Sequence, residues 1–394
     1  MNIILFETDQ RNCLLPLCYT RPVALLRTGI LTILEKWKMR LSGNYSFKTV
    51  PYLKEKFPLR VENDNLLVSS HFCPTDQLVE AIAQLGFFQG IKYQGFPLAV
   101  RLPEEDAKMY PQVSTTIQWS DFAGELDLVR YVWDLNTVCE SQIRLDFNLL
   151  TRGRKSVTPS PTNQIIAPEN VFIEEGAKVE CSVINASSGP VYIGKDAEIM
   201  EGSLVRGPFA MSEHAVLNMG TKVYGPVSIG PHCKVGGEVS HSILLGYSNK
   251  GHDGFLGHSI LGEWCNIGAG TNVSNLKNSY DKVKVWSYPE NKFIRTGLQF
   301  CGLIMGDHSK VGINTMFNTG TVVGVGCNVY GAGFPRQFVP SFSAGGGQGY
   351  KVQQLKSVFE TAAQVMARRK SVFTDADQRL LTTIFEQSEV YRKF

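Results

Sequence analysis

The sequence predicts an α/β, Rossmann-like domain followed by a left-handed parallel β-helix and a short set of C-terminal helices. Three observations lead to this prediction. Residues 1–150 alternate between strand, loop and helix patterns. Beyond residue 189, glycines are frequent and aliphatic residues recur every six positions. After residue 347, two segments carry apolar residues at helical spacing. We therefore expect an α/β domain, a linker, a β-helix and terminal helices at residues 1–150, 151–168, 169–341 and 342–394.

The composition is that of a folded cytoplasmic protein. Hydrophobic residues make up 43% and charged residues 19% of the 394 positions, which excludes disordered and fibrous classes. A net charge of +3 does not indicate nucleic acid as the main partner. Nine cysteines are dispersed without metal-ligand spacing, as in proteins that keep reduced thiols. Glu7 and Asp9 interrupt the apolar N-terminus, and no window reaches the roughly 18 apolar residues that span a bilayer, so we expect neither a signal peptide nor membrane contact.

The first 150 residues show the alternation typical of a parallel sheet. We expect Asn2–Phe6 to form a buried strand and Gly29–Met39 to form a helix whose apolar residues share one face. Leu66–Val68 is expected as a second strand, followed by a helix at Thr75–Leu85 with Thr75 near its N-cap. Three prolines in Thr151–Pro168 predict the linker.

The second half of the chain has a period of six. A helix would give a period of 3.6 and a free strand a period of 2, so neither explains it. Hexapeptide repeats do, because each repeat is one short strand plus a turn and three repeats complete one coil of a parallel β-helix. A β-sandwich would leave the register unexplained. The periodic positions, which we expect to point inward, are Ile193, Ile199, Val205, Met211, Leu217, Val223, Ile229, Val235, Leu261, Ile267, Val273, Met305, Val311, Phe317, Val323 and Val329.

The period breaks twice, at residues 236–260 and 274–304. Breaks in a solenoid usually mark loops on its binding face. Both stretches are rich in His, Lys and Asn, among them His252 and Asn275. We therefore expect loops at both breaks, and the functional site at these loops.

Two helices are expected at the C-terminal end. Leu355–Met366 places its apolar residues on one face. The second helix is expected to begin at Asp375, with Thr374 and Asp377 as its cap. The basic cluster Arg368–Lys370 fits a solvated helix end near a negative dipole better than a nucleic-acid patch.

Motifs in both halves of the chain resemble GlmU-type enzymes. In the periodic region these motifs are Asn249–Gly257 (NKGHDGFLG), Asn266–Thr271 (NIGAGT) and Ser274-Asn275. In the first domain, Leu14–Leu26 is similar to the phosphate loop of sugar nucleotidyltransferases, through Thr-Arg-Pro followed by apolar residues. As a whole, the chain looks like the alternate GlmU-type proteins of Bacteroidetes, which join a short nucleotidyltransferase-like domain to a hexapeptide-repeat acyltransferase.

The resemblance implies an acetyl-CoA-dependent N-acetyltransferase that acts on an amino-sugar-1-phosphate, in the first place glucosamine-1-phosphate. It also implies transfer of a nucleotide from UTP or dTTP, as in the synthesis of UDP-N-acetylglucosamine. Two alternatives stay open: a sugar-1-phosphate nucleotidyltransferase whose β-helix only forms a trimer, and a non-enzymatic regulator that binds sugar nucleotides. The identity of the sugar and nucleotide and the length of the acyl chain also stay open.

The resemblance assigns roles at the acyl site. His252 occupies the position of the general base, and histidine suits this role because its pKa lies near the working pH. Asn275 and Asn266 would contact the sugar. The backbone at Ala269 and Gly270 would approach acetyl-CoA, where an amide can steady the developing oxyanion. Phe255 stands where the family usually has a sugar-contacting tyrosine, and the chemistry needs no metal.

A sugar phosphate also needs cations. The resemblance places Lys282 near the family's sugar-binding lysine. Lys250, Lys222 and Arg206 are further candidates.

The nucleotidyl site departs from the family pattern. The family's glycine-rich loop would fall at Thr8–Arg11, where this chain has no glycine. Val23 stands at the position of the family's lysine, and Ser69-Ser70-His71 stands at the position of the metal-binding Gly-Asp. Phosphate-binding candidates are Arg11, Arg21 and Arg27, and Asp9 is a weak candidate for Mg²⁺ if this domain is active.

The β-helix predicts an assembly. A three-sided solenoid exposes flat apolar faces, while the first domain and the terminal helices can cover its two ends. Side-by-side packing with threefold closure remains. We therefore expect a homotrimer whose acyl sites are shared between subunits.

Overall fold

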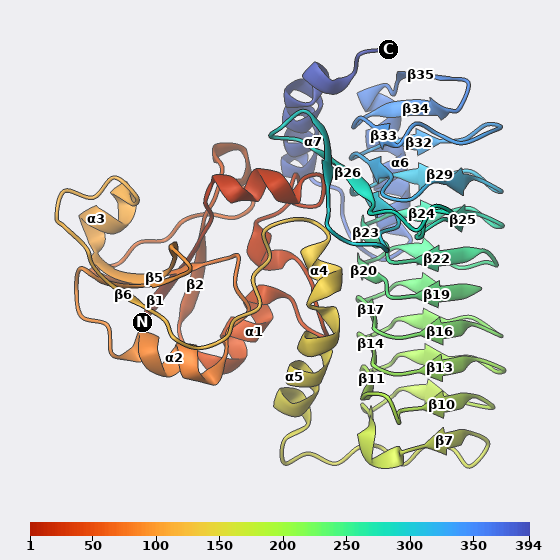
Figure 1. The fold of residues 1–394 in the computed structure, drawn as a ribbon, viewed down its shortest axis with the longest axis horizontal. Coiled ribbons are helices and arrows are strands. Elements are labelled where there is room, and N and C mark those ends of the chain that lie inside the picture. Colours follow the sequence, from red (N-terminus) through yellow and green to blue (C-terminus); the bar gives the residue numbers. More distant parts are fainter. The chain divides into compact units, whose positions relative to one another are not determined.

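A computed structural model describes all 394 residues, and the chain forms two compact units. The first unit contains Met1–Leu14, Thr20–Leu26 and Leu31–Tyr131, and the second contains Leu15–Tyr19, Arg27–Ile30 and Val132–Phe394. Figure 1 shows an α/β unit at low residue numbers and a long stack of strands at high ones. No helix in the structure has the length and apolar character needed to cross a membrane. The predicted fold class is confirmed.

The first unit is built on a six-stranded mixed sheet with the order β2-β1-β3-β5-β4-β6. The pairs β2-β1, β1-β3 and β4-β6 are parallel, as expected, but β5 runs antiparallel to both of its neighbours. Strands β4 and β5 form a hairpin, because Gln94 and Gly95 between them both adopt positive φ, the conformation of a tight hairpin turn. The elements of this unit are β1 Asn2–Phe6, α1 Ile33–Arg40, β2 Asn44–Lys48, β3 Asp64–Ser69, α2 Asp76–Ala83, β4 Gln89–Tyr93, β5 Phe96–Pro103, α3 Glu104–Met109 and β6 Gln118–Asp121.

Side-chain caps set the starts of the first two helices. The hydroxyl of Thr32 accepts a hydrogen bond from the Glu35 amide, and the Glu35 carboxylate accepts one from the Thr32 amide. Helix α1 therefore begins at Ile33, later than the expected Gly29. Thr75 caps α2 as predicted, through the amide of Leu78.

The second unit contains a parallel β-helix of three faces. Each coil adds one strand to the first, the second and the third face in turn. The first face contains β7 Gln164–Ile166, β10 Val183–Asn185, β13 Leu204–Arg206, β16 Lys222–Tyr224, β19 Glu238–Ser240, β22 Phe255–Gly257, β25 Asn272–Val273 and β30 Met316–Phe317. The second contains β8 Val171–Ile173, β11 Val191–Ile193, β14 Phe209–Met211, β17 Val227–Ile229, β20 Ile243–Gly246, β23 Ile260–Glu263, β28 Ile304–Met305, β31 Val322–Val323 and β33 Phe338–Val339. The third contains β9 Lys178–Val179, β12 Glu198–Ile199, β15 Val216–Leu217, β18 Lys234–Val235, β21 Asn249–Lys250, β24 Asn266–Ile267, β29 Lys310–Val311, β32 Asn328–Val329, β34 Ser343–Gly346 and β35 Gly349–Val352.

The core of this solenoid is the column of side chains that the period of six predicts. All sixteen predicted inward positions are buried in one continuous apolar cluster. Burial of this stacked aliphatic surface is the main contribution to stability, at about 25 cal/mol per Å². The outward side chains of the second face, such as Ala210 and Ser228, are buried as well, whereas those of the first face, such as Leu204 and Tyr224, are half exposed.

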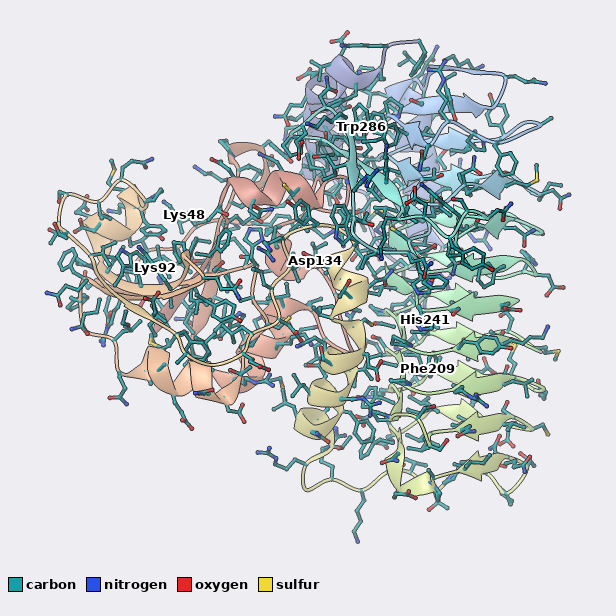
Figure 2. All side chains as sticks on the ribbon, viewed as in Figure 1. Lys48, Lys92, Asp134, Phe209, His241 and Trp286 are labelled. Carbon is teal, nitrogen blue, oxygen red and sulfur yellow. The ribbon has the colours of Figure 1, made fainter.

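The two breaks in the period have different structures. Residues 236–260 remain in the wall of the solenoid as β19 to β22, and the expectation of a loop there is wrong. The corners are shorter, so Val235 pairs with Lys250 and the period slips without an excursion. The second break does leave the wall between β25 and β28, and it contains the antiparallel hairpin of β26 Lys284–Ser287 and β27 Lys292–Arg295. Its Trp286, labelled in Figure 2, stacks on Phe338 of β33 with ring centroids 4.3 Å apart.

Four helices complete the second unit: α4 Asp134–Thr137, α5 Cys139–Thr151, α6 Leu355–Ala367 and α7 Asp375–Gln387. Helix α5 packs against β17 of the second face. Helices α6 and α7 contact each other, and α7 begins at Asp375 with the predicted cap between Thr374 and Asp377.

Candidate active site

A groove of about 810 Å³ lies between the third face of the solenoid and the C-terminal end of α6. Its floor is made of outward residues of successive third-face strands, and one wall comes from α6. The lining residues are Asn218, Lys234, Tyr247, Asn249, Gly251, His252, Trp264, Cys265, Asn266, Ile267, Gly268, Ala269, Lys310, Ile313, Val365, Arg368 and Arg369. A cavity of this size accommodates a sizeable part of a cofactor-like molecule.

His252 lies at the edge of this groove, in the turn between β21 and β22. The side chain is exposed, so solvent and ligands can reach the imidazole. The turn packs directly on the preceding coil, because a Cβ on Gly237 would lie 2.8 Å from the His252 carbonyl oxygen. Gly237 itself adopts a φ of 72°, which favours glycine.

Asn266 and Ala269 lie in the same groove, one coil further along the solenoid. Asn266 is the exposed first residue of β24, and Ala269 follows it at the corner between the third and first faces. The Ala269 carbonyl accepts a hydrogen bond from the Asn314 amide, while its own N–H has no partner in the chain. Gly270 does not line the groove. Its N–H donates to the Asp253 carbonyl at 3.0 Å.

Four basic side chains also line the groove: Lys234, Lys310, Arg368 and Arg369. Arg369 donates to the Asn249 side chain at 3.1 Å, which links α6 to strand β21. The ammonium of Lys310 donates to the Trp264 carbonyl, and burial lowers its pKa. The sequence indicates no role for Lys234 or Lys310. It predicts Arg368 and Arg369 only as a helix end, since the packing direction of α6 is a tertiary property. The basic cluster that follows an amphipathic helix was the available signal.

The sequence-predicted Asn275 belongs to a different cluster. A Cβ on Gly257 would lie 2.5 Å from both Asn275 Nδ2 and the Phe255 ring, so these two side chains converge over the glycine. Asn275 Nδ2 lies 2.9 Å from Nδ1 of His258. Burial lowers the pKa of His258 to about 4, so the ring is neutral at pH 7 and its Nδ1 accepts this hydrogen bond.

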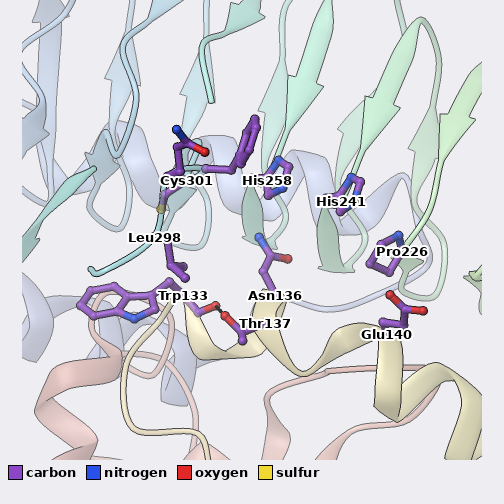
Figure 3. A pocket seen from close by; sticks show the side chains of 11 residues that line it. Trp133, Asn136, Thr137, Glu140, Pro226, His241, His258, Leu298 and Cys301 are labelled. Carbon is purple, nitrogen blue, oxygen red and sulfur yellow. Dashed lines mark hydrogen bonds between the residues drawn. The ribbon is translucent and has the colours of Figure 1, made fainter. Parts of the chain in front are cut away.

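His258 forms one wall of a second pocket of about 300 Å³, shown in Figure 3. Its ring stacks between His241 and Phe300, with centroid separations of 4.5 and 5.0 Å. Asn136 of α4 and Glu140 of α5 face this stack from the opposite side of the pocket (Figure 3). Asn275 touches this stack through His258 and is not among the residues that line the groove of His252.

The predicted substrate cations are dispersed. Lys222 and Arg206 line a depression of about 370 Å³ on the exposed first face. Lys282 is exposed in the insertion, where its carbonyl accepts a hydrogen bond from Lys277. The side chain of Lys250 points into the solenoid core and is only 1% exposed. Its expected role as a direct substrate contact does not match this burial.

The three arginines of the predicted phosphate site are buried and engaged. Arg11 forms an ion pair with Glu7 at 3.2 Å and donates to the Tyr52 hydroxyl at 3.1 Å. Glu7 also accepts the amide of Val23, and burial raises its pKa against the opposing effect of Arg11. Arg21 is 6% exposed. Arg27 lies in the second unit, where it donates to the Ile30 carbonyl.

The side chains around Asp9 do not form a magnesium site. Asp9 is exposed, and nowhere in the 394 described residues do three His, Cys, Asp or Glu side chains gather as metal ligands. His71, at the position of the family's metal-binding motif, is buried, its Nδ1 lies 3.0 Å from the Val129 carbonyl, and burial lowers its pKa to about 4. These residues do not fit Mg²⁺ on protein carboxylates.

The first part of the chain matches one known family model. Residues 3–155 match the family model described as "Sugar nucleotidyl transferase". This region contains the six-stranded sheet apart from Asn2, the first residue of β1.

The curated relatives that match are described as bifunctional proteins. The chain is 28% identical over 162 residues to the bifunctional sugar-1-phosphate nucleotidylyltransferase/acetyltransferase of Sulfurisphaera tokodaii, covering 41% of this chain and 39% of that protein. It is 26% identical over 204 residues to the bifunctional protein GlmU of a Cyanothece species, covering 46% and 41%. This chain thus spans about two fifths of the length of these relatives. Among solved structures, the polySia-specific acetyltransferase NeuO aligns with 52% of this chain and 93% of its own, at 12% identity and a TM-score of 0.30.

Proposed function

We propose that the protein is an acetyl-CoA-dependent N-acetyltransferase acting on an amino-sugar-1-phosphate, with glucosamine-1-phosphate as the first candidate. The observation that carries the proposal is the groove that brings together His252, the unbonded N–H of Ala269 and four cations. The two bifunctional relatives, both similar in part to this chain, support the same combination of activities.

His252 acts as the general base in this proposal. As the sugar amine attacks the thioester carbonyl, the imidazole takes the proton that the amine loses. A C–N bond forms, the C–S bond breaks, and the proton passes on to the departing sulfur of CoA. The N–H of Ala269 donates to the oxyanion of the tetrahedral intermediate, where preorganised donors lower the barrier most.

The cations of the groove bind the phosphates of CoA. Arg368 and Arg369 present planar guanidinium groups, which match phosphate geometry in a bidentate way. Lys234 and Lys310 add positive charge along the third face. In this arrangement the thioester of acetyl-CoA lies beside His252.

The acceptor sugar binds to the exposed first face in this proposal, near Asn275 and Phe255. Phe255 offers an aromatic surface to a sugar ring, and Lys222, Arg206 and Lys282 are the candidate phosphate ligands. Because Asn275 does not line the groove of His252, a neighbouring subunit completes the acyl site in this proposal. The half-exposed Leu204, Tyr224 and Met316 make this face suited to a homotrimer interface.

A second activity, nucleotidyl transfer from UTP or dTTP, is proposed for residues 1–150, and the family match to residues 3–155 favours it. Arg11 and Arg21 are the phosphate ligands in this proposal. Without a protein carboxylate site for Mg²⁺, the metal would arrive with the nucleotide.

One assay series tests both activities. The protein is incubated with acetyl-CoA and glucosamine-1-phosphate, and then with UTP or dTTP and Mg²⁺, and products are identified by mass spectrometry. We expect a gain of one acetyl group on the sugar phosphate. The absence of acetylated product with all amino-sugar-1-phosphates tried would refute the first activity, and unchanged nucleotide would refute the second.

A further inference from the structure

Lys250 occupies a position at which the rest of the solenoid has aliphatic side chains. In the column of inward residues on the third face, it pairs with Val235 below and is followed by Ile267 above. The flanking residues belong to the apolar core, and Lys250 is buried to the same degree. A buried ammonium without a carboxylate partner is unfavourable unless hydrogen bonds compensate for its lost hydration. Such a break of the local pattern is expected where function requires it.

The hydrogen bonds of Lys250 go to the backbone of the turn that carries His252. Its Nζ donates to the carbonyl of His252 and, at 3.0 Å, to the carbonyl of Gly236 on the coil below. It thus ties the His252 peptide to the preceding coil from inside the solenoid.

Every carbonyl of this turn is held by a donor. Asn218 Nδ2 donates to Gly251 at 2.7 Å, and the amide of Gly270 donates to Asp253 at 3.0 Å. The amide of Glu238 donates to Gly254 at 3.3 Å. The His252 carbonyl is the one held by a charged group, so Lys250 decides the orientation of the peptide next to the imidazole.

We propose that Lys250 is a positioning residue, which fixes the backbone of His252 from the core and thereby aims its imidazole into the groove. This inference rests on the proposed role of His252 as the base. It differs from direct substrate binding, because the ammonium lies on the opposite side of the strand from the groove.

The Lys250→Met variant tests the proposal, with Leu217→Met as the matched control. Methionine fills the inward position without a donor, and Leu217 lies in the same column two coils below, outside the groove. We expect Lys250→Met to lower kcat for acetyl transfer by about 10–100-fold, since a misplacement near 1 Å has effects of this size. The KM for acetyl-CoA should change less than twofold, and Leu217→Met should match the wild type.

Hydrogen exchange of residues 251–254 provides a readout that does not depend on activity. We expect faster exchange in Lys250→Met and the wild-type rate in Leu217→Met. His252→Ala, measured in parallel, separates the two ideas: if it keeps wild-type kcat, the proposed base is wrong, whatever Lys250 does. If His252→Ala is inactive while Lys250→Met keeps wild-type kcat or unchanged exchange, the positioning role is refuted.

Discussion

At the scale of single residues, the account depends on one exposed histidine in a rigid turn. His252 lies exposed in a groove with donors and cations, whereas His71 is buried and His258 is half-buried, and burial lowers the pKa of each to about 4. Neutral imidazoles of this kind, each with its Nδ1 in a hydrogen bond, suit structural roles. An accessible imidazole suits proton transfer.

Replacement of His252 by alanine should lower kcat for acetyl transfer by about 10²–10⁴-fold, the usual contribution of a positioned general base. Stability should not change, since the side chain is exposed. His214→Ala is the control, because this histidine stacks on His232 outside the groove. Steady-state kinetics and thermal unfolding of the three proteins check the prediction, and equal kcat values would remove His252 from the mechanism.

The buried Lys250 also predicts a pH dependence of stability. Burial lowers its pKa to about 8 from an ordinary value of 10.5. Between these two values the unfolded chain binds more protons than the folded one, so stability rises with pH in this window. Below pH 8 the charged group costs the folded state on the order of 3 kcal/mol.

The unfolding free energy of Lys250→Met minus that of the wild type should therefore fall from pH 8 to pH 10.5. Urea titrations of both proteins across this range measure the difference, in which the other titrating groups cancel. A difference that stays constant with pH would mean that the ammonium keeps its ordinary pKa.

At the scale of elements, the period of six predicted the solenoid, since each coil must repeat its inward residues to stack. The same period misled at residues 236–260. A shortened corner and an inserted loop both interrupt the six-residue period. Only the pairing of Val235 with Lys250 shows that this break is a shortened corner. The groove could be predicted in part: His252, Asn266 and Ala269 come from the motifs, but the wall from α6 depends on helix packing that no local pattern encodes.

Gly257 tests the packing of the second cluster. An alanine there would bring its Cβ within 2.5 Å of Asn275 and the Phe255 ring, so Gly257→Ala should destabilise the fold by about 1–3 kcal/mol. Gly246→Ala is the matched control on the neighbouring face, because its Cβ would meet nothing closer than 3.6 Å. Equal unfolding free energies of the two variants would contradict the described convergence.

The C-terminal end of α6 contributes to binding of acetyl-CoA in the proposed function. Replacing both Arg368 and Arg369 by alanine should raise the KM for acetyl-CoA by at least about tenfold at nearly constant kcat, the effect of losing a charge-assisted hydrogen bond. Lys356→Ala, on an exposed part of the same helix, is the control. A KM within twofold of the wild type would place the CoA phosphates elsewhere.

At the scale of the whole molecule, the proposed function requires a neighbouring subunit to complete the acyl site. The exposed apolar side chains of the first face are the surface proposed for that contact. Light scattering should give about three times the chain mass of 43.7 kDa. Replacing Leu204 and Tyr224 by charged residues should dissociate the assembly and abolish acetyl transfer together. A fully active monomer at nanomolar concentration would refute the shared site.

The most direct test of the central claim is a crystal structure of the protein with acetyl-CoA and glucosamine-1-phosphate, using the His252→Ala variant to prevent turnover. The account predicts the CoA phosphates against Arg368 and Arg369, and the thioester carbon beside residue 252 with its oxygen at the Ala269 amide. The sugar amine should lie about 3–3.5 Å from the thioester carbon, as in a near-attack geometry. Density for acetyl-CoA outside this groove, with residue 252 facing empty solvent, would contradict the assignment of the acyl site.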